Sequence, residues 1–461
     1  MRDHTAGDLF LPVVRRAADL LAVVPHTLGY WPADSLVLLG AGGGQAGACV
    51  RVDLPGEACD DPGAEAFAAE LADLVRADEF SDRVFVVVYA SEAVAGRDGL
   101  PPAAGHALAL AEHAAERADR EVAGSWVVAG DRWWAAGSPT GARHVAEILD
   151  SAVNAALVAG GSSYATAPRL AMDHEYGALP AGTERGVAAA AVRWARAGRG
   201  TWHRLERLAG ALAVWDDVLR AVERAVDRWQ PVVLALDDDL LGFLAAGLED
   251  PVLADLLLAA CATGDSDGVL AAAVLWAELC EEDLEEELGA VHGGRAPGTG
   301  AVPDGPSLAP APPWLPPVPR RKGKGPRGRG TGAGRPALPE PDAERLALFF
   351  RVLDGKSEEA PCWARLDALY RVLLALSWLL EPAGGPPHGG GARPHAGVAA
   401  AVLVQLAQLN RFRARGSHTA HFVRRATALV PGHPTALRVL RLAEARPVPD
   451  WARRRSTAWH A

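Results

Sequence analysis

The sequence has few cysteines, and their spacing excludes the usual cysteine-based scaffolds. Five occur among 461 residues, at Cys49, Cys59, Cys261, Cys280 and Cys362, and no two form a Cys-x-x-Cys pair. An odd number without that spacing favours neither a disulfide framework nor a structural zinc site. We therefore predict free thiols and a reducing, cytoplasmic location.

Long apolar runs and standard catalytic motifs are also missing. No apolar run free of charge reaches about 18 residues, the length of a membrane-spanning helix, so we expect no membrane association. The first five residues, Met-Arg-Asp-His-Thr, are followed by no apolar stretch typical of a signal peptide. Neither HExxH nor GxxxxGK[ST] is present. We predict no bound metal and no cofactor.

The residues that are present are sufficient for large cores. Hydrophobic residues make up 49% of the chain, and its length suggests two to four domains. Residues 82–89 are apolar on both faces, as in a central strand. The pattern predicts strands at 35–39, 48–54, 82–89, 122–129 and 132–136, and helices at 64–76 and 103–118. Residues 1–142 are thus predicted to form a mixed α/β (or α+β) domain, with helices covering a mixed sheet.

The rest of the chain has a helical pattern. We predict helices at 143–159, 183–197, 201–228, 238–247, 251–262, 268–287, 343–353, 362–380 and within 397–446. Residues 143–287 then form a helical region and 341–461 a helical C-terminal domain. Residues 288–340 are rich in Gly, Pro and Arg, a composition typical of a disordered linker.

The opening block, residues 19–55, has the most distinctive sequence. It contains Asp-Leu-Leu-Ala at 19–22, Pro-His-Thr-Leu-Gly at 25–29, Pro-Ala-Asp-Ser-Leu-Val at 32–37 and Arg-Val-Asp-Leu-Pro at 51–55. Pro25 lacks an N–H, so we expect the first helix to end before it.

With Gly130–Trp134 and Pro449–Trp451, this block resembles an actinobacterial family known as domain of unknown function 4192. The Cys-Cys-Pro segment typical of that family is replaced by residues 135–141. The resemblance implies a fold and carries no established activity.

Four polar residues of the opening block are the catalytic candidates: His26, Ser35, Arg51 and Asp53. A hairpin could bring a serine, a histidine and an acid together for nucleophilic catalysis. The structural alternative is that Ser35 caps a turn, His26 bonds a backbone carbonyl and Asp53 pairs with Arg51.

Other motifs in the sequence fit structural roles better than catalytic or ligand-binding roles. Residues 42–47 match G-x-G-x-x-G, but a strand-like stretch follows instead of a helix, which favours a hairpin loop over a dinucleotide site. Residues 264–268 match G-x-S-x-G between two helical segments, not at a strand end. Residues 173–175 and the pair His418 and His421 offer too few ligands for a metal.

Charge is distributed unevenly. The net charge is −11, yet residues 391–461 hold twelve Arg and two acidic residues. Because Arg is rarely buried unpaired, we expect this tail to meet solvent or acidic groups, with residues 280–287 as its internal partner. The basic stretch 320–330 has no aromatic residue for base stacking, so nucleic-acid binding is possible and not favoured.

The C-terminal helices carry a second resemblance. Residues 425–437 are similar to the second helix and exit turn of a tetratricopeptide repeat, at Ala426, Leu429, Pro431, Pro434, Ala436 and Leu437. The Trp-Leu-Gly-Tyr signature of the first helix is missing, and one unit is fewer than a stable array needs. We expect a tetratricopeptide-like hairpin near 397–446.

Taken together, these features predict an uncharacterised cytoplasmic protein acting as a non-catalytic interaction or regulatory module. Its expected partner is a protein bound through the C-terminal helices. Two alternatives stay open: a hydrolase-type enzyme centred on residues 19–55, and an accessory nucleic-acid-binding protein that uses the basic linker and tail.

Overall fold

The structure, a computed structural model, divides the chain into two compact units, residues 1–177 and 178–461. It describes residues 13–55, 61–91, 102–138, 141–166, 186–198, 205–225, 229–276, 343–380 and 394–459. The predicted linker 288–340, the acidic stretch 280–287 and residues 173–175 lie outside these ranges. The predicted division at residues 142, 287 and 340 stays a prediction.

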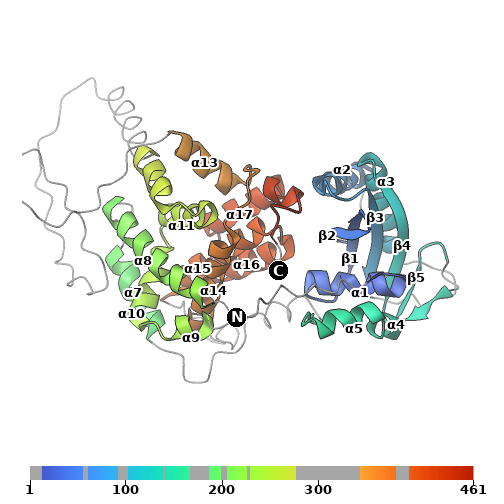
Figure 1. The fold of residues 1–461 in the computed structure, drawn as a ribbon, viewed down its shortest axis with the longest axis horizontal. Helices are drawn as coiled ribbons and strands as arrows, with labels where there is room; N and C mark the ends of the chain where they lie inside the picture. The colour runs from blue at the N-terminus through green and yellow to red at the C-terminus, as the bar shows by residue number, and fades with distance from the viewer. Residues whose placement is uncertain are drawn as a thin grey trace, which may run out of the picture. The chain divides into compact units, whose positions relative to one another are not determined.

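A six-stranded mixed sheet forms the centre of the first unit (Figure 1). Its spatial order is β2-β1-β3-β4-β5-β6, and β3 and β4 are its parallel pair. The strands are β1 (Ser35–Gly42), β2 (Gln45–Asp53), β3 (Arg83–Ala90), β4 (Glu121–Ala129), β5 (Arg132–Ala135) and β6 (Arg143–His144). The predicted mixed sheet and the interior position of β3 are confirmed.

The glycine motif is a hairpin turn, as predicted. β1 and β2 pair antiparallel up to Gly42 and Gln45, so only Gly43 and Gly44 connect them. Both have positive φ, +56° and +80°, which glycine adopts without steric cost and which a tight two-residue hairpin requires. No helix begins after the motif, and the pyrophosphate-binding arrangement of a dinucleotide fold is therefore missing here.

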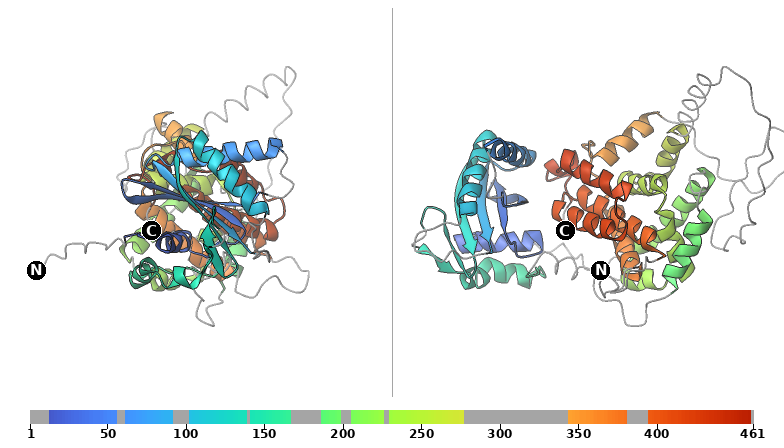
Figure 2. Two further views of the ribbon diagram at one scale, coloured as in Figure 1. Left: turned by 90° about the vertical axis from the view of Figure 1, so that its right-hand side faces the viewer. Right: turned by 180° about the vertical axis from the view of Figure 1, so that it is seen from behind.

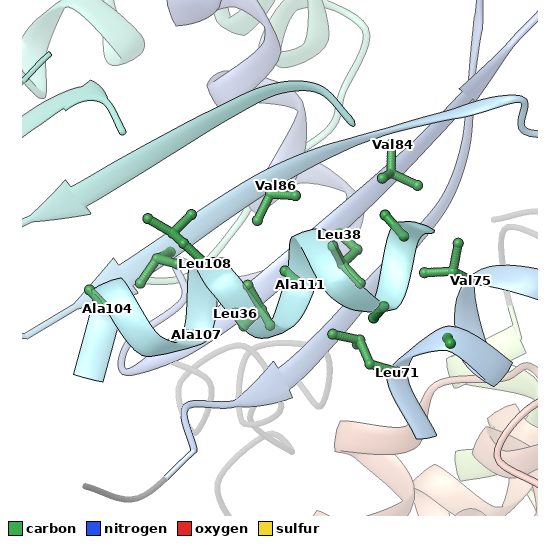
Figure 3. Close-up of a cluster of buried hydrophobic side chains, with 14 of the residues drawn as sticks. Leu36, Leu38, Leu71, Val75, Val84, Val86, Ala104, Ala107, Leu108 and Ala111 are labelled. Atoms are coloured by element: carbon green, nitrogen blue, oxygen red, sulfur yellow. The ribbon is translucent and has the colours of Figure 1, made fainter. Parts of the chain in front are cut away.

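One face of the sheet is covered by α2 (Asp61–Ala77) and α3 (Pro102–Arg117), as Figure 3 shows. Alternate residues of the strands, among them Leu36, Leu38 and Val86, pack against small residues of α3 such as Ala107 and Ala111. The alternation follows from the period of two along a strand. Because α3 joins β3 to β4, it supplies the crossover that a parallel pair needs.

The other face packs against α1 (Ala17–Leu28) and α4 (Ala146–Leu149), so helices lie on both sides of the sheet (Figures 1 and 2). Trp133 enters this second core, while Trp134 packs on the first, so the two indoles point to opposite faces of the sheet.

The prediction that the first helix ends before Pro25 is wrong. Pro25 lies inside α1, which ends at Gly29 with φ +80°. Proline inside a helix removes one backbone hydrogen bond, at a cost of about 3 kcal/mol. Burial of Leu21 and Val24 against the sheet offsets that loss.

Residues 143–159 were predicted to form one helix, and the structure shows three elements instead. Arg143 and His144 form β6, α4 follows, and α5 (Ala152–Ala159) starts anew after Ser151. The Ser151 hydroxyl accepts a hydrogen bond from the Asn154 amide at 3.1 Å, a standard helix N-cap. Because Ser151 caps the N-terminus of α5, a new helix begins there and the predicted single helix is interrupted.

The described part of the second unit contains helices and no strand (Figure 1). They are α7 (Val187–Gly198), α8 (Leu205–Arg224), α9 (Trp229–Leu234), α10 (Asp238–Gly247), α11 (Pro251–Thr263), α13 (Ala343–Asp354), α14 (Trp363–Leu380), α15 (Ala396–Phe412), α16 (Gly416–Leu429) and α17 (Pro434–Ala445), with further helix at 266–276. α14 and α15 are buried along most of their length and form its centre. The mainly helical C-terminal half is thereby confirmed.

The family-like motif Pro449–Trp451 closes this unit. It leads into a short 3-10 helix, Asp450–Arg453, and the Trp451 side chain is 1% exposed. The Trp451 indole N–H donates to the Phe412 carbonyl at 2.8 Å, and the Asp450 amide donates to the Gly355 carbonyl at 2.9 Å. The motif therefore has a structural role, because it ties the end of α15 to the segment after α13.

Among the residues that the structure describes, no helix has the length and apolar character needed to cross a bilayer.

Candidate functional site

Three of the four catalytic candidates lie together on the face of the sheet that packs on α1. Ser35 pairs with Tyr89 of β3 on one side and with Asp53 of β2 on the other, and Arg51 pairs with Val37. The Ser35 hydroxyl donates to the Ala33 carbonyl at 2.6 Å and accepts from Arg51 Nε at 2.7 Å. Its one proton is therefore donated to a carbonyl, and no base among the described residues is hydrogen-bonded to the Ser35 hydroxyl.

Asp53 does not reach this hydroxyl. Its carboxylate pairs with Arg51 Nη2 at 2.6 Å, and its side chain is 83% exposed. Asp53 also lines an open groove between β2 and α2, with Val52, Leu54, Phe67 and Glu70 among its other walls. His26 is not part of that groove, so the structure does not gather the four candidates around one concave site.

His26 lies in the last turn of α1 and bonds two residues that the sequence did not single out. Its Nδ1 is 2.9 Å from the Ser162 hydroxyl, and its Nε2 is 2.9 Å from Asn154 Oδ1. The expected backbone carbonyl partner for His26 is thus wrong. The pairing of Arg51 with Asp53 and the turn role of Ser35 agree with the structural alternative.

Ser162 and Asn154 sit at opposite ends of α5, and both positions have local causes. Asn154 follows the Ser151 cap. Ser162 follows Gly160, which is the C-cap of α5, and Gly161, whose φ of +88° turns the chain away from the helix. Serine after a glycine pair is usually a turn residue, so residue type alone gave no chemical signal. Contact with His26 depends on tertiary packing across more than 120 positions of sequence.

A tyrosine ring packs against this histidine, and two further aromatic rings of the same unit pack against each other. Tyr164 meets His26 edge to face with ring centroids 4.7 Å apart, and Trp31 meets Tyr89 at 6.0 Å. The Tyr89 hydroxyl is buried without a hydrogen-bond partner among the described residues, and burial raises its pKa. Burial also raises the pKa of the Cys49 thiol to about 12, which keeps this thiol protonated and unreactive at neutral pH.

No group of three or more His, Cys, Asp or Glu side chains able to hold a metal ion occurs in the part of the chain that the structure describes.

The arginines of the C-terminal tail are largely engaged within the second unit. Arg438 on α17 contacts both oxygens of Asp255 on α11, at 2.7 and 2.5 Å. Arg413 bonds Asp367 on α14 at 2.5 Å and lies between the rings of Tyr370 and Trp459, 4.0 and 4.6 Å from their centroids. These acidic partners come from α11 and α14, and the predicted partner stretch 280–287 lies outside the described residues.

Two of these arginines are buried, and one of them contradicts the expectation that the tail meets solvent or acidic groups. Arg413 is 8% exposed and pairs with Asp367, whereas Arg411 is 1% exposed and bonds no carboxylate among the described residues. Arg411 donates to the Leu353 carbonyl and, from Nε, to Gln408 at 3.1 Å. Its burial lowers the guanidinium pKa to about 10. A count of charged residues does not include backbone carbonyls, which can accept hydrogen bonds from a buried arginine that has no carboxylate partner.

A small part of the tail charge stays open to solvent. Arg424 of α16 and Arg441 of α17 are exposed and have no ion pair with any residue in the described ranges. Leu437, four residues before Arg441 on α17, is 43% exposed. We call Arg424, Leu437 and Arg441 the basic face of the C-terminal helices.

Comparison with models of protein families shows which family the chain belongs to. The family model described as Domain of unknown function (DUF4192) matches residues 18–287, more than half of the sequence. The chain belongs to the DUF4192 family. No curated protein and no solved structure matches the chain. The DUF4192 match includes His26, Asn154 and Ser162 but ends before the basic face, so that face is not part of the matched region.

Proposed function

We propose that the protein is a partner-binding module whose basic face holds an acidic protein segment. The observation that carries the proposal is the charge left over after internal pairing. Most tail arginines bond within the second unit, whereas Arg424 and Arg441 have no acidic partner among its described residues. An acidic partner would neutralise both.

The exposed leucine favours a protein as the partner. Leu437 and Arg441 are four residues apart on α17, so their side chains share one side of that helix. An apolar group beside a cation matches an acidic amphipathic segment, in which apolar and acidic residues alternate at helical spacing. A phosphate backbone offers charge but no apolar counterpart, which ranks nucleic acid second.

The tetratricopeptide-like resemblance supports the same role. Residues 430–433 connect α16 to α17, and the His433 side chain accepts a hydrogen bond from the Ala436 amide at the start of α17. Ala426 and Ala436, two of the matched positions, are fully buried. Stacked arrays of such helix pairs form concave binding surfaces, and we propose that this single pair contributes one binding face.

The remaining expectations are part of this proposal. Free thiols at Cys49, Cys261 and Cys362 support a reducing cytoplasm as the compartment. An actinobacterial origin stays a prediction from the motifs. The hydrolase alternative gains no support from Ser35, because Arg51 and a carbonyl hold its hydroxyl.

The test is a titration of the full chain with a fluorescent, amphipathic, Glu-rich helical peptide. In the variant R424E/R441E we expect at least a tenfold weaker Kd, because two attractions become repulsions. The matched control R196E/R224E makes the same charge change on α7 and α8, where Arg196 and Arg224 are also exposed. R196E/R224E should bind within about twofold of the native chain.

Two results would contradict the proposal. Equal losses in R196E/R224E and R424E/R441E would show that only net charge matters. Equal competition by a DNA duplex of the same charge, falling steeply with salt, would favour the nucleic-acid alternative. The variant L437S separates the apolar contribution, since it should weaken the peptide but leave the salt dependence unchanged.

A further inference from the structure

Beyond partner binding, the geometry around His26 points to a nucleophilic site: we infer that Ser162, His26 and Asn154 form an acyl-transfer site for small activated esters. Ser162 is the nucleophile, His26 the general base and Asn154 the residue that positions the base. This site lies in the first unit and makes no use of the basic face.

The hydrogen bonds allow only one protonation pattern for the neutral imidazole. The Asn154 amide NH2 donates to the Leu149 carbonyl at 2.7 Å, so its Oδ1 is turned toward His26. An amide oxygen only accepts, and Nε2 must therefore carry the proton. Nδ1 is then an acceptor, 2.9 Å from the Ser162 hydroxyl that donates to it. A nucleophile, a base and a group that orients the base are thus in contact.

Neighbouring contacts hold the three residues in place. The Ser162 amide donates to the Leu157 carbonyl at 2.9 Å, which ties it to the end of α5. Ala165 exchanges hydrogen bonds with the stretch that follows α1: its amide donates to the Gly29 carbonyl at 3.0 Å, and it accepts from the Trp31 amide at 2.8 Å. The Tyr164 ring also limits rotation of the imidazole. Such support is what catalytic geometry requires.

The site is open to small molecules. Ser162 is half-buried, and its neighbours Gly161 and Ser163 are exposed. A Cβ placed at Gly161 would meet no atom within 4 Å. The backbone N–H groups of Ser163 and Tyr164 donate to no acceptor in the described ranges. Free amides beside a nucleophile can bind the negative oxygen of a tetrahedral intermediate.

The reaction is balanced without a cofactor. Ser162 Oγ forms a bond to the ester carbonyl carbon as its proton moves to His26 Nδ1. The tetrahedral intermediate collapses and the bond to the leaving oxygen breaks. The proton on Nδ1 passes to that oxygen or, where the leaving group is a stable anion, to solvent. Water then attacks the acyl-serine as Nδ1 accepts its proton, the bond between the acyl carbon and Ser162 Oγ breaks, and Nδ1 returns the proton to Oγ, which releases the acid and restores Ser162. The exposure of Gly161 and Ser163 beside the nucleophile favours short acyl groups, which need no enclosed pocket.

The experiment uses p-nitrophenyl acetate and a fluorophosphonate probe with the full chain. Peptide mapping should place the fluorophosphonate on Ser162, and S162A should lose both the label and ester hydrolysis. H26A should lower the hydrolysis rate about 100-fold or more, the usual contribution of a general base. S138A is the control, because Ser138 is an exposed serine of the first unit outside the site, and it should keep the labelling rate and position.

Asn154 needs a readout that a merely structural role would not change. N154A should slow labelling, and N154D, which still offers an oxygen to Nε2, should restore it. If a variant unfolds, S162C provides a second measure, because a thiol beside an imidazole should react with iodoacetamide faster than Cys362 and lose that advantage in S162C/H26A. Label elsewhere, equal hydrolysis by S162A, or no His26 dependence of S162C would overturn the inference.

Discussion

The contact between Arg438 and Asp255 is the sharpest test of how the second unit uses its charges. Asp255 is the more buried partner, with 12% of its side chain exposed against 39% for Arg438. Replacing Arg438 with Met keeps much of the apolar stem but leaves the carboxylate without its two donors. Removing one partner of a fully buried pair costs about 3–5 kcal/mol. Since Arg438 is more than a third exposed, we discount this for solvent screening and expect about 2 kcal/mol.

The assay is a double-mutant cycle in urea with R438M, D255L and R438M/D255L. Amide hydrogen exchange in α11 and α17 reports the second unit separately from the first. The double variant should be more stable than R438M, because it contains no unpaired carboxylate. R438M within about 0.5 kcal/mol of the native chain, or a strictly additive double variant, would refute the reasoning.

Three further predictions follow from the structure. Gly242→Ala should destabilise the second unit by about 1–3 kcal/mol in urea, because the new Cβ would lie 2.5 Å from Ala190 Cβ and 2.7 Å from the Ala191 backbone nitrogen; an unchanged midpoint would contradict this packing. Iodoacetamide at pH 8 should modify exposed Cys362 well before Cys49, whose pKa is about 12; peptide mapping that shows equal rates would disprove the burial argument. Burial lowers the His418 pKa to about 2 from its ordinary 6.5, so below pH 6.5 the unfolded chain binds a proton that the folded chain does not. The free energy of unfolding should therefore fall on acidification, by up to about 1.4 kcal/mol per pH unit. Between pH 6 and 5 this fall should be smaller in the variant His418→Gln; an equal fall in the variant and the native chain would contradict the prediction.

The sheet could be predicted from the sequence because its signals are local. Alternating apolar residues mark β2, a continuous apolar run marks β3, and glycines mark both hairpins. Each signal depends on a few neighbouring residues and their backbone conformations, and tertiary packing reinforces it. The helix predicted between β3 and β4 indicated a crossover, which joins parallel strands, and the hairpins indicated antiparallel pairs, so a mixed sheet was expected.

Pro25 and Arg411 show where local reasoning failed. Proline predicts a helix end from its missing N–H, yet burial of the α1 face against the sheet outweighs that loss. The charge of arginine predicts that Arg411 is exposed to solvent. Hydrogen bonds to the Leu353 carbonyl and to Gln408 allow it to be buried instead. For both residues the interactions that determine the conformation come from tertiary structure, and residue propensities do not include such interactions.

The candidate site was predicted only in part for the same reason. His26 was identified by its chemistry, and Ser35, Arg51 and Asp53 do meet across β1 and β2. Ser162 and Asn154 were missed, because serine and asparagine near helix ends are common caps and only the fold shows which of them meets a histidine.

Trp451 has a consequence for how the protein is made. During synthesis the first unit can fold as soon as its own residues have emerged, since its sheet needs nothing beyond residue 177. The second unit must wait, because Trp451 fills a buried place beside Phe412 and follows every long helix of that unit in the chain. Until it arrives, the end of α15 lacks both an aromatic neighbour and a donor for its carbonyl. A ribosome stalled before residue 451 should therefore display a finished first unit attached to an incomplete helical one.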